Sequence, residues 1–222
     1  YMFDAIFYFY LKTNNQKYLI PVEKLLSNIS SKGIYDQLAG GIARYTVDEK
    51  WVIPHFEKML YDNIQYISLL TKFYQKTKKE YFKKKLIQTI NFLNKEFKNS
   101  ENLYGSAYDA DSEGVEGKYY VWSYEELKNL LQDDLTLLEK KYEISNTGNF
   151  EGKNILVESK KKLTEEENNK IIEIEKKLVQ ERQKRTKPFF DNKSQTDLNA
   201  FLLDTLINVS IVLEDSKLKN DA

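Results

Sequence analysis

The sequence predicts a mainly α-helical protein built from helix pairs joined by loops. Apolar residues recur at helical spacing along most of the chain, and strand-like alternation is confined to a few short pieces. Glycines, aromatics and charges concentrate in the segments between the expected helices. Such an array forms either a solenoid or a closed toroid of helical hairpins, and the absence of a visible repeat of about 30 to 45 residues disfavours a simple solenoid.

Four helices are expected in the first half of the chain. Residues 1–12 form the first, and Pro21 suits the first turn of a second that stops near Gly33. A third begins at Met59, and a fourth covers residues 81–97. The irregular segment between the second and third is long for a compact domain. A connection of that length is usually functional or disordered, and this one is too aromatic to be disordered.

The second half predicts a small β-hairpin followed by more helices. Residues 103–122 read as two short strands around an acidic, glycine-containing turn. Ser123 and Glu126 form a capping-box pattern, and a second such pattern opens a polar helix over residues 164–187, which we expect to project into solvent. Pro188 ends that helix, and the apolar face from Leu198 onward predicts a last one.

Composition excludes several classes of function. With 41% hydrophobic residues among 222, the chain can bury a real core. Lys plus Arg and Asp plus Glu number 34 each, so no net field favours nucleic acid or an anionic membrane as a partner. Cysteine is absent, which removes disulfides, thiol catalysis and thiolate metal sites. No stretch approaches the ~20 apolar residues of a membrane span. We expect a soluble, cytoplasmic protein without metal or cofactor.

The only histidine of the chain stands in "WVIPHFEKMLYDN". Pro54 fixes the approach to His55, and Glu57 lies two residues on, where its carboxylate could accept a hydrogen bond or proton from the imidazole. A histidine held by a carboxylate is a plausible acid and base couple. The plainer interpretation is a structural histidine. The polar side chains that follow within two helical turns are Tyr61, Asp62 and Asn63.

The stretch "YDQLAGGIARYTVDEKW" carries the side-chain types that grip sugars. Planar hydrogen-bonding and charged groups bind hydroxyls, and aromatic faces cover the apolar side of a sugar ring. The candidate binding residues are Tyr35, Asp36, Gln37, Arg44, Tyr45, Asp48 and Trp51. The alternative is that Asp36 and Arg44 merely pair across a turn.

The acidic hairpin "DADSEGVEG" imitates the start of a calcium-binding loop. Asp109, Asp111 and Glu113 occupy ligand-like positions, but Tyr120 stands at the twelfth position, where a bidentate Glu is needed. We therefore reject an EF-hand, keep a noncanonical cation site as the lesser alternative, and expect these acids, with Tyr108, to reach a neighbouring cleft. The later loop "GNFEGKN" lacks the spacing of a phosphate-binding P-loop.

Three long motifs carry a family resemblance. "GIYDQLAGGIARYTVDEKWVIPHFEKMLYDN", "YGSAYDADSEGVEGKYYVWSYEEL" and "GNFEGKNIL" resemble the large domain of the spermatogenesis-associated, thioredoxin-domain-containing proteins. The resemblance implies an (α/α)6 toroid preceded by a thioredoxin-like domain. That toroid is the six-hairpin architecture of N-acylglucosamine 2-epimerases and several glycosidases and lyases. The analogy in fold does not by itself determine function.

The chain departs from this family in three respects. The expected upstream thioredoxin-like part is absent. Ala43 stands where the family usually has a histidine, and Leu198 replaces a tryptophan in "DNKSQTDLNAF". Twelve barrel helices with ordinary helix and loop lengths also need well over about 300 residues. We therefore expect residues 1–222 to form one domain that is about the first half of the toroid, or a shortened member.

Three hypotheses on function follow. The first is a sugar-processing domain of the epimerase or glycoside-cleaving type, in which His55 is the acid or base, Glu57 assists it, and a small sugar or glycan is the ligand. The second is a noncatalytic scaffold whose loops hold a glycan or a partner protein. The third treats the loop residues as a buried polar network that ties helices together, and predicts that Asp36→Ala sharply lowers the melting temperature.

Overall fold

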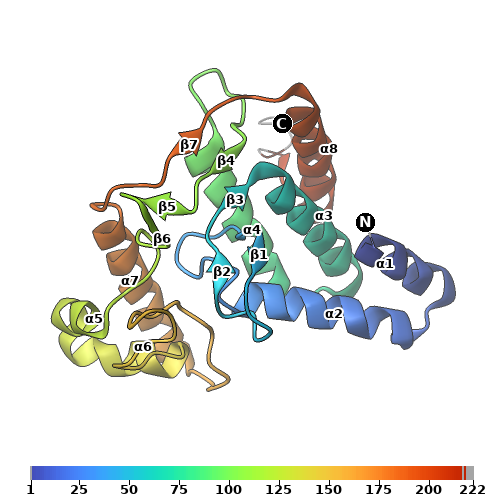
Figure 1. Ribbon diagram of the computed structural model, residues 1–222. Coiled ribbons are helices and arrows are strands. Elements are labelled where there is room, and N and C mark those ends of the chain that lie inside the picture. Colours follow the sequence, from blue (N-terminus) through green and yellow to red (C-terminus); the bar gives the residue numbers. More distant parts are fainter. Residues whose placement is uncertain (1, 217, 219–222) are drawn as a thin grey trace. The chain divides into compact units, whose positions relative to one another are not determined.

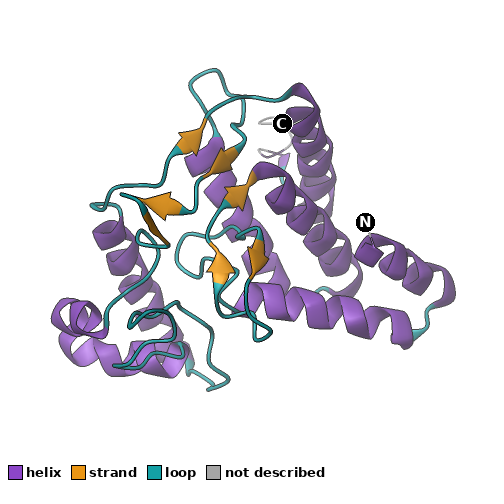
Figure 2. Ribbon diagram, in the orientation of Figure 1, coloured by secondary structure: helices purple, strands orange, loops and turns teal. Residues whose placement is uncertain are grey.

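The computed structural model describes residues 2–216 and 218, and it confirms the mainly α-helical class with a small β-hairpin (Figures 1 and 2). The chain divides into two compact units. The helical unit comprises Tyr1–Ser30, Met59–Ala107 and Asn192–Ala222. The loop-rich unit comprises Ser31–Lys58 and Tyr108–Asp191.

The helical unit is a bundle centred on the third helix. Its elements are α1 (Met2–Thr13), α2 (Gln16–Ser31), α3 (Leu60–Thr77), α4 (Glu80–Phe92), the π-helical turn η1 (Leu93–Phe97) and α8 (Thr196–Leu213). Helix α3 packs against both α4 and α8. Leu60, Ile64, Ile67 and Leu70 are fully buried, at the spacing of three or four residues that the sequence predicts.

The start of α2 differs from the prediction. Pro21 lies inside the helix rather than in its first turn, because the helix begins at Gln16. The side chain of Asn15 accepts a hydrogen bond from the backbone N–H of Lys17, and this polar start precedes the apolar spacing on which the prediction relied. The predicted end near Gly33 is close to the observed last residue of the helix, Ser31.

Helix α8 is long and apolar enough, by length and composition alone, to cross a membrane. No such stretch was expected from the sequence. The helix also forms part of a packed core, since Leu202, Leu206 and Val209 are buried where α8 contacts α3. The core helix of a globular bundle meets the same criterion, so length and composition do not separate the two cases.

The loop-rich unit contains three helices and two short antiparallel ribbons. The helices are α5 (Tyr124–Leu131), α6 (Leu135–Lys141) and α7 (Glu165–Arg182), with the 3-10 turn η2 (Gln132–Asp134) between the first two. Strands β1 (Tyr45–Thr46) and β2 (Pro54–His55) pair, and β5 (Asp111–Ser112) pairs with β6 (Val115–Glu116). The short strands β3 (Lys58–Met59), β4 (Ala107–Tyr108) and β7 (Phe190–Asp191) lie where the chain passes from one unit to the other.

Helix α7 begins as predicted but does not project into solvent. Thr164 and the glutamate three residues later form the complete capping box. Ile171, Ile174 and Leu178 are buried in a core cluster with residues of α5 and α6, because they share one face of an otherwise polar helix. The helix ends at Arg182, earlier than the predicted stop at Pro188.

The acidic hairpin folds as the sequence predicts. Its central residues, Glu113 and Gly114, both have positive φ (53° and 72°), as a type I′ turn requires. Asp111 and Glu116 are partners in the resulting register. Among the described residues no group of His, Cys, Asp or Glu side chains is arranged to hold a metal ion.

Candidate functional site

The segment from Pro54 to Lys58 presents two chemically different faces. Pro54, Phe56 and Lys58 are buried, whereas the intervening His55 and Glu57 are partly exposed. Successive side chains of an extended segment point to opposite sides, so one short stretch serves two environments. The buried side lines a pocket of the loop-rich unit, and neither His55 nor Glu57 is among the pocket-lining residues.

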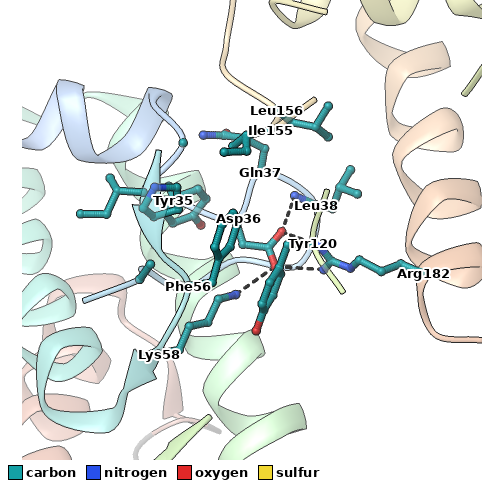
Figure 3. A pocket seen from close by; sticks show the side chains of 14 residues that line it. Tyr35, Asp36, Gln37, Leu38, Phe56, Lys58, Tyr120, Ile155, Leu156 and Arg182 are labelled. Atoms are coloured by element: carbon teal, nitrogen blue, oxygen red, sulfur yellow. Dashed lines mark hydrogen bonds and ion pairs between the residues drawn. The ribbon is translucent and has the colours of Figure 1, made fainter. Parts of the chain in front are cut away.

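An ion cluster of three buried side chains lies in this pocket (Figure 3). Arg182, the last residue of α7, holds Asp36 with two parallel hydrogen bonds, Nη1 to Oδ1 at 2.9 Å and Nη2 to Oδ2 at 3.0 Å. Lys58 donates to the same carboxylate, with Nζ 2.9 Å from Oδ2. The three side chains are only 4–6% exposed. The cluster therefore ties α7 to two loop segments from the first quarter of the chain.

Backbone groups complete the shell around Asp36. Its Oδ1 also accepts from the backbone N–H groups of Leu38 and Ala39, each at 3.1 Å. Lys58 donates a further hydrogen bond to the carbonyl oxygen of Gly40. Short side-chain-to-backbone bonds of this kind are what Asp supplies in a turn, and here they orient the carboxylate toward the two cations.

The electrostatics keep Asp36 and Arg182 ionised. Burial alone would raise the pKa of Asp36, but the charges and hydrogen bonds of Arg182 and Lys58 outweigh it and hold that pKa well below its ordinary value. Burial would lower the pKa of Arg182, and Asp36 reverses the effect, so the pKa of the guanidinium is raised. Burial and the nearby negative charge of Asp36 raise the pKa of Tyr120, which stays a neutral phenol.

Aromatic and aliphatic side chains form the rest of the pocket. The Tyr120 ring stacks on Phe56 with centroids 5.7 Å apart, and Lys58 Nζ lies 4.8 Å from the centroid of the same tyrosine. Ile155 and Leu156 close another side (Figure 3). The cavity that these side chains leave has a volume of only about 30 Å³. The shell is therefore apolar, and the charges inside it are poorly screened.

His55 belongs to a separate, more exposed cluster. Its Nδ1 lies 2.8 Å from Oε1 of Glu116, and its ring stacks on Tyr45 with centroids 5.0 Å apart. The side chains of His55 and Glu116 are 30% and 44% exposed. The pairing of β1 with β2 sets the stack, because Tyr45 and His55 are register partners. The carboxylate that holds the imidazole is thus Glu116 from β6.

The expected partners of two charged residues are corrected by these contacts. Glu57 does not bond to His55; it pairs with Arg44, whose Nη1 lies 3.0 Å from Oε2. The alternative pairing of Asp36 with Arg44 across a turn does not form among the described residues. Asp36 pairs instead with Arg182 and Lys58. Local spacing suggested both pairings, and contacts more distant in sequence replace them.

The other sequence-predicted residues lie in several places. Tyr35 and Gln37 line the pocket with Asp36. Asp48 accepts hydrogen bonds from three backbone N–H groups of its own loop, and Trp51 adopts a positive φ of 63° in that loop. Both residues thus shape the turn between β1 and β2.

The acidic hairpin and its neighbours do not contribute to the lining of the pocket. Tyr108 stacks on Phe190, Asp109 accepts from the backbone N–H of Asp111, and Glu113 pairs with a lysine at the surface. Tyr61, Asp62 and Asn63 belong to the helical unit, where the amide of Asn63 donates to the carbonyl oxygen of Met59. The expectation that all these side chains gather around one concavity is therefore not met within the loop-rich unit.

Sequence reasoning missed Phe56, Lys58, Glu116, Tyr120 and Arg182. The alternation of apolar and polar residues from Pro54 onward was a usable signal, because it places Lys58 on the same side as Phe56. Arg182 gave no comparable signal. It lies 146 residues from Asp36 in the chain, in a helix whose sequence is dominated by exposed charges.

The fold and site define a mainly helical domain whose loops hold a buried ion cluster and an exposed histidine–carboxylate pair. No family model matches the chain. Spermatogenesis-associated protein 20 of Homo sapiens is 28% identical over 232 residues, which cover 89% of this chain and 30% of that protein. The Mus musculus protein is 32% identical over 141 residues, which cover 56% of this chain and 18% of that protein. An uncharacterised protein of Caenorhabditis elegans is 28% identical over 236 residues, which cover 90% of this chain and 32% of that protein.

These relatives confirm the resemblance read from the three motifs: the chain is similar in sequence to the spermatogenesis-associated proteins. It spans about a third or less of the length of the curated relatives it matches. Among solved structures, a family 76 glycoside hydrolase from a bovine Bacteroides thetaiotaomicron strain aligns with 96% of this chain and 42% of its own, with a TM-score of 0.43 and 14% identity. A likeness of that degree carries no argument about function.

Proposed function

We propose that the loop-rich unit performs acid/base chemistry on a sugar, with His55 as the proton-transferring group. The observation that carries the proposal is the contact of the imidazole with Glu116 at 2.8 Å in a position that solvent reaches. A carboxylate at Nδ1 fixes the tautomer and orientation of a histidine ring. The opposite nitrogen, Nε2, is then the atom that can exchange a proton with a ligand.

The surroundings of the pair fit a sugar better than an apolar ligand. Tyr45, which is 49% exposed, offers a ring face beside the imidazole. Arg44 directly precedes Tyr45, and Glu57 lies two residues after His55. Both side chains are partly exposed, so the guanidinium can donate hydrogen bonds to hydroxyl groups and the carboxylate can accept them. In this proposal Glu116 takes the assisting role first assigned to Glu57, and Glu57 is a binding group.

The test is a turnover assay over a panel of monosaccharides and glycosides, with epimerisation and hydrolysis followed separately. His55→Gln removes the titrating group at similar size, and we expect a loss of about 10²- to 10⁴-fold in rate, the usual contribution of a general acid or base. Glu116→Gln should also lower the rate, because the imidazole loses the carboxylate that orients its ring.

The matched control is Glu173→Gln. Glu173 is also an exposed carboxylate in an ion pair, here with Lys176 on the outer face of α7, and it lies outside the cluster around His55. This variant should keep the rate and pH profile of the unmodified protein. Equal rates for the unmodified protein and His55→Gln on every substrate would remove the support for acid/base chemistry at this residue.

A second candidate function is a noncatalytic scaffold that binds a glycan or a partner protein. It is favoured by the way Asp36 is used, because a carboxylate held by Arg182, Lys58 and two backbone groups is not available to position a substrate hydroxyl. Glycan binding that persists in His55→Ala, without turnover in either protein, would select the scaffold over the enzyme.

A further inference from the structure

Helix α1 of the helical unit is apolar on its exposed side as well as on its buried side. Phe7 and Tyr10 are buried, and the Phe7 ring packs against Phe73 of α3 with centroids 6.3 Å apart. Large apolar side chains that are more than half exposed are found in α1 and at the start of α2, namely Met2, Tyr8, Phe9, Leu11 and Ile20. A helix that is apolar all round normally buries both of its sides.

Ring contacts join part of this exposed surface into a row that spans both helices. The centroid of the Phe9 ring lies 6.2 Å from that of Tyr8 and 5.8 Å from that of Tyr18 in α2. A lysine stands over each end of the row. Lys12 Nζ is 5.3 Å from the centroid of Tyr8, and Lys17 Nζ is 4.8 Å from that of Tyr18. Exposed apolar surface that is contiguous and rimmed by polar groups is typical of an interaction site.

The turn between α3 and α4 brings further lysines to the same end of the helical unit. Lys76 Nζ lies 5.9 Å from the ring centroid of Tyr10 in α1. Lys72 pairs with Asp4 of α1 at 2.6 Å, and Lys79 pairs with a glutamate of α2. These contacts hold the turn beside both helices, so its cations lie near the aromatic row.

Lysines outnumber acidic residues at this end. Residues 2–24 and 72–84 contain nine lysines and three acids, and two of the acids, Asp4 and Glu23, already pair with lysines. The lysines that make no ion pair among the described residues include five that lie over tyrosine rings instead, namely Lys12, Lys17, Lys76, Lys78 and Lys83. The zero net charge of the whole chain therefore averages over a local positive excess.

We propose that this end of the helical unit docks on the surface of an anionic lipid bilayer. The docking patch consists of the exposed apolar side chains of α1 and α2 together with the five lysines over tyrosine rings. The apolar side chains leave water for the boundary between headgroups and acyl chains, and the lysines meet the negative headgroups. Tyrosine suits the same boundary, because its ring has an apolar body and a polar tip.

The chemistry of the docking patch favours a bilayer over other partners. Met2, Leu11 and Ile20 have no ring face on which a nucleic-acid base could stack. A second copy of the chain is disfavoured, because two lysine-rich patches repel each other. The patch belongs to the helical unit alone, so the proposal does not depend on proton chemistry at His55 in the loop-rich unit.

The test is sedimentation of the whole chain with lipid vesicles. Vesicles of phosphatidylcholine alone are the neutral probe, and vesicles that also contain about a third phosphatidylserine are the anionic probe. We expect binding to the anionic vesicles only, and weaker binding when the salt concentration is raised from about 0.1 M to about 0.5 M. A single-stranded oligonucleotide, followed by fluorescence anisotropy, probes a nucleic-acid partner.

A charge variant tests the lysines. Lys12→Gln combined with Lys17→Gln removes two cations, and we expect it to weaken vesicle binding by about tenfold or more and to reduce its salt dependence. The matched control is Lys160→Gln combined with Lys161→Gln. It makes the same change in charge at two exposed lysines of the loop-rich unit.

An apolar variant tests insertion. Ile20→Gln removes an exposed apolar side chain of α2, and we expect it to weaken binding several-fold at both salt concentrations, because salt does not screen the burial of apolar surface. Ile172→Gln, at an exposed isoleucine of the polar helix α7, is the matched control. All the substituted side chains are exposed, and circular dichroism checks that each variant is folded.

Salt-sensitive binding to the anionic vesicles that the patch variants weaken and the control variants preserve supports the proposal. Equal binding to neutral and anionic vesicles, no binding to either, or equal losses in the patch and control variants overturns it. Binding of the oligonucleotide without binding of the vesicles also overturns it, in favour of a nucleic-acid partner. Because the readout is vesicle binding, it can fail while turnover through His55 persists, and the reverse.

Discussion

The two faces of residues 54–58 place similar ion pairs in opposite environments. On the inner face, the Lys58–Asp36 pair has side chains 4% and 6% exposed; on the outer face, the His55–Glu116 pair has side chains 30% and 44% exposed. The inner charges cannot be separated without leaving one of them unpaired in an apolar shell. The members of the outer pair are open to water, so they can be separated at little cost. The buried contacts that stabilise the unit and the proposed proton chemistry thus lie on different sides of one short segment.

The largest expected effect comes from removing the centre of the inner cluster. Asp36→Ala leaves Lys58 and Arg182 buried without their shared carboxylate, and it also deletes the acceptor for two backbone N–H groups. Breaking a buried ion pair from one side typically costs about 3–5 kcal/mol. Chemical denaturation followed by circular dichroism should show a loss of that size.

A double variant sharpens this expectation. Combining Asp36→Ala with Lys58→Met removes one of the two cations that Asp36→Ala leaves buried without a carboxylate. The double variant should therefore lose less stability than the sum of the losses of the two single variants. Additive losses would mean that Asp36 acts mainly through its backbone contacts rather than through the buried charges.

A somewhat smaller effect is expected at Gly117, which supports the wall of the pocket. Its φ is +71°, and an added Cβ would lie 2.5 Å from the ring of Phe56. Gly117→Ala should therefore combine a left-handed backbone cost of about 1–2 kcal/mol with an overpacking cost of about 1–3 kcal/mol.

Gly114 provides the matched control for that variant. It has nearly the same φ, +72°, but nothing lies within 4 Å of its added Cβ. Gly114→Ala should show only the backbone cost, so the difference between the two variants in free energy of unfolding isolates the contact with Phe56. Equal losses would show that the pocket wall adjusts freely.

The sequence predicted the helices better than it predicted the contacts of the site. Apolar periodicity locates α3 and α8, and the capping box locates the start of α7, because these signals are local. The cluster around Asp36 depends on Arg182, which reaches it only when α7 packs against the core through residues such as Ile174. Pairing over such a separation leaves no trace in local spacing.

The same reasoning explains why the partner of His55 was misassigned. Glu57 is close in sequence, but the alternation that points Phe56 inward sends both His55 and Glu57 outward as neighbours along one edge. The position opposite the imidazole is filled instead by Glu116, 61 residues away, after the β5–β6 hairpin folds. The sequence predicts the β5–β6 hairpin, but it does not predict that the hairpin lies beside His55.

Acid should weaken the inner ion cluster around Asp36. The pKa of Asp36 is held below its ordinary value of 3.8 in the folded chain, so the unfolded chain takes up a proton at a higher pH than the folded chain does. The stabilisation is complete above that range and is lost progressively as the pH falls below about 4. Asp36→Asn should therefore lose less stability between pH 5 and pH 3, on the order of a kcal/mol less, than the unmodified protein.

The smallest effect is expected on the outer face, at the Arg44–Glu57 pair. Its side chains are 46% and 26% exposed, and water and salt screen their attraction. A double-mutant cycle with Arg44→Ala and Glu57→Ala should give a coupling energy of about 0.2–1 kcal/mol that decreases at 1 M salt. The corresponding cycle for Asp36 and Lys58 should give a larger and less salt-sensitive value, because both side chains are buried. Equal coupling energies in the two cycles would contradict the division of roles between the faces, since burial would then have no bearing on what each pair contributes.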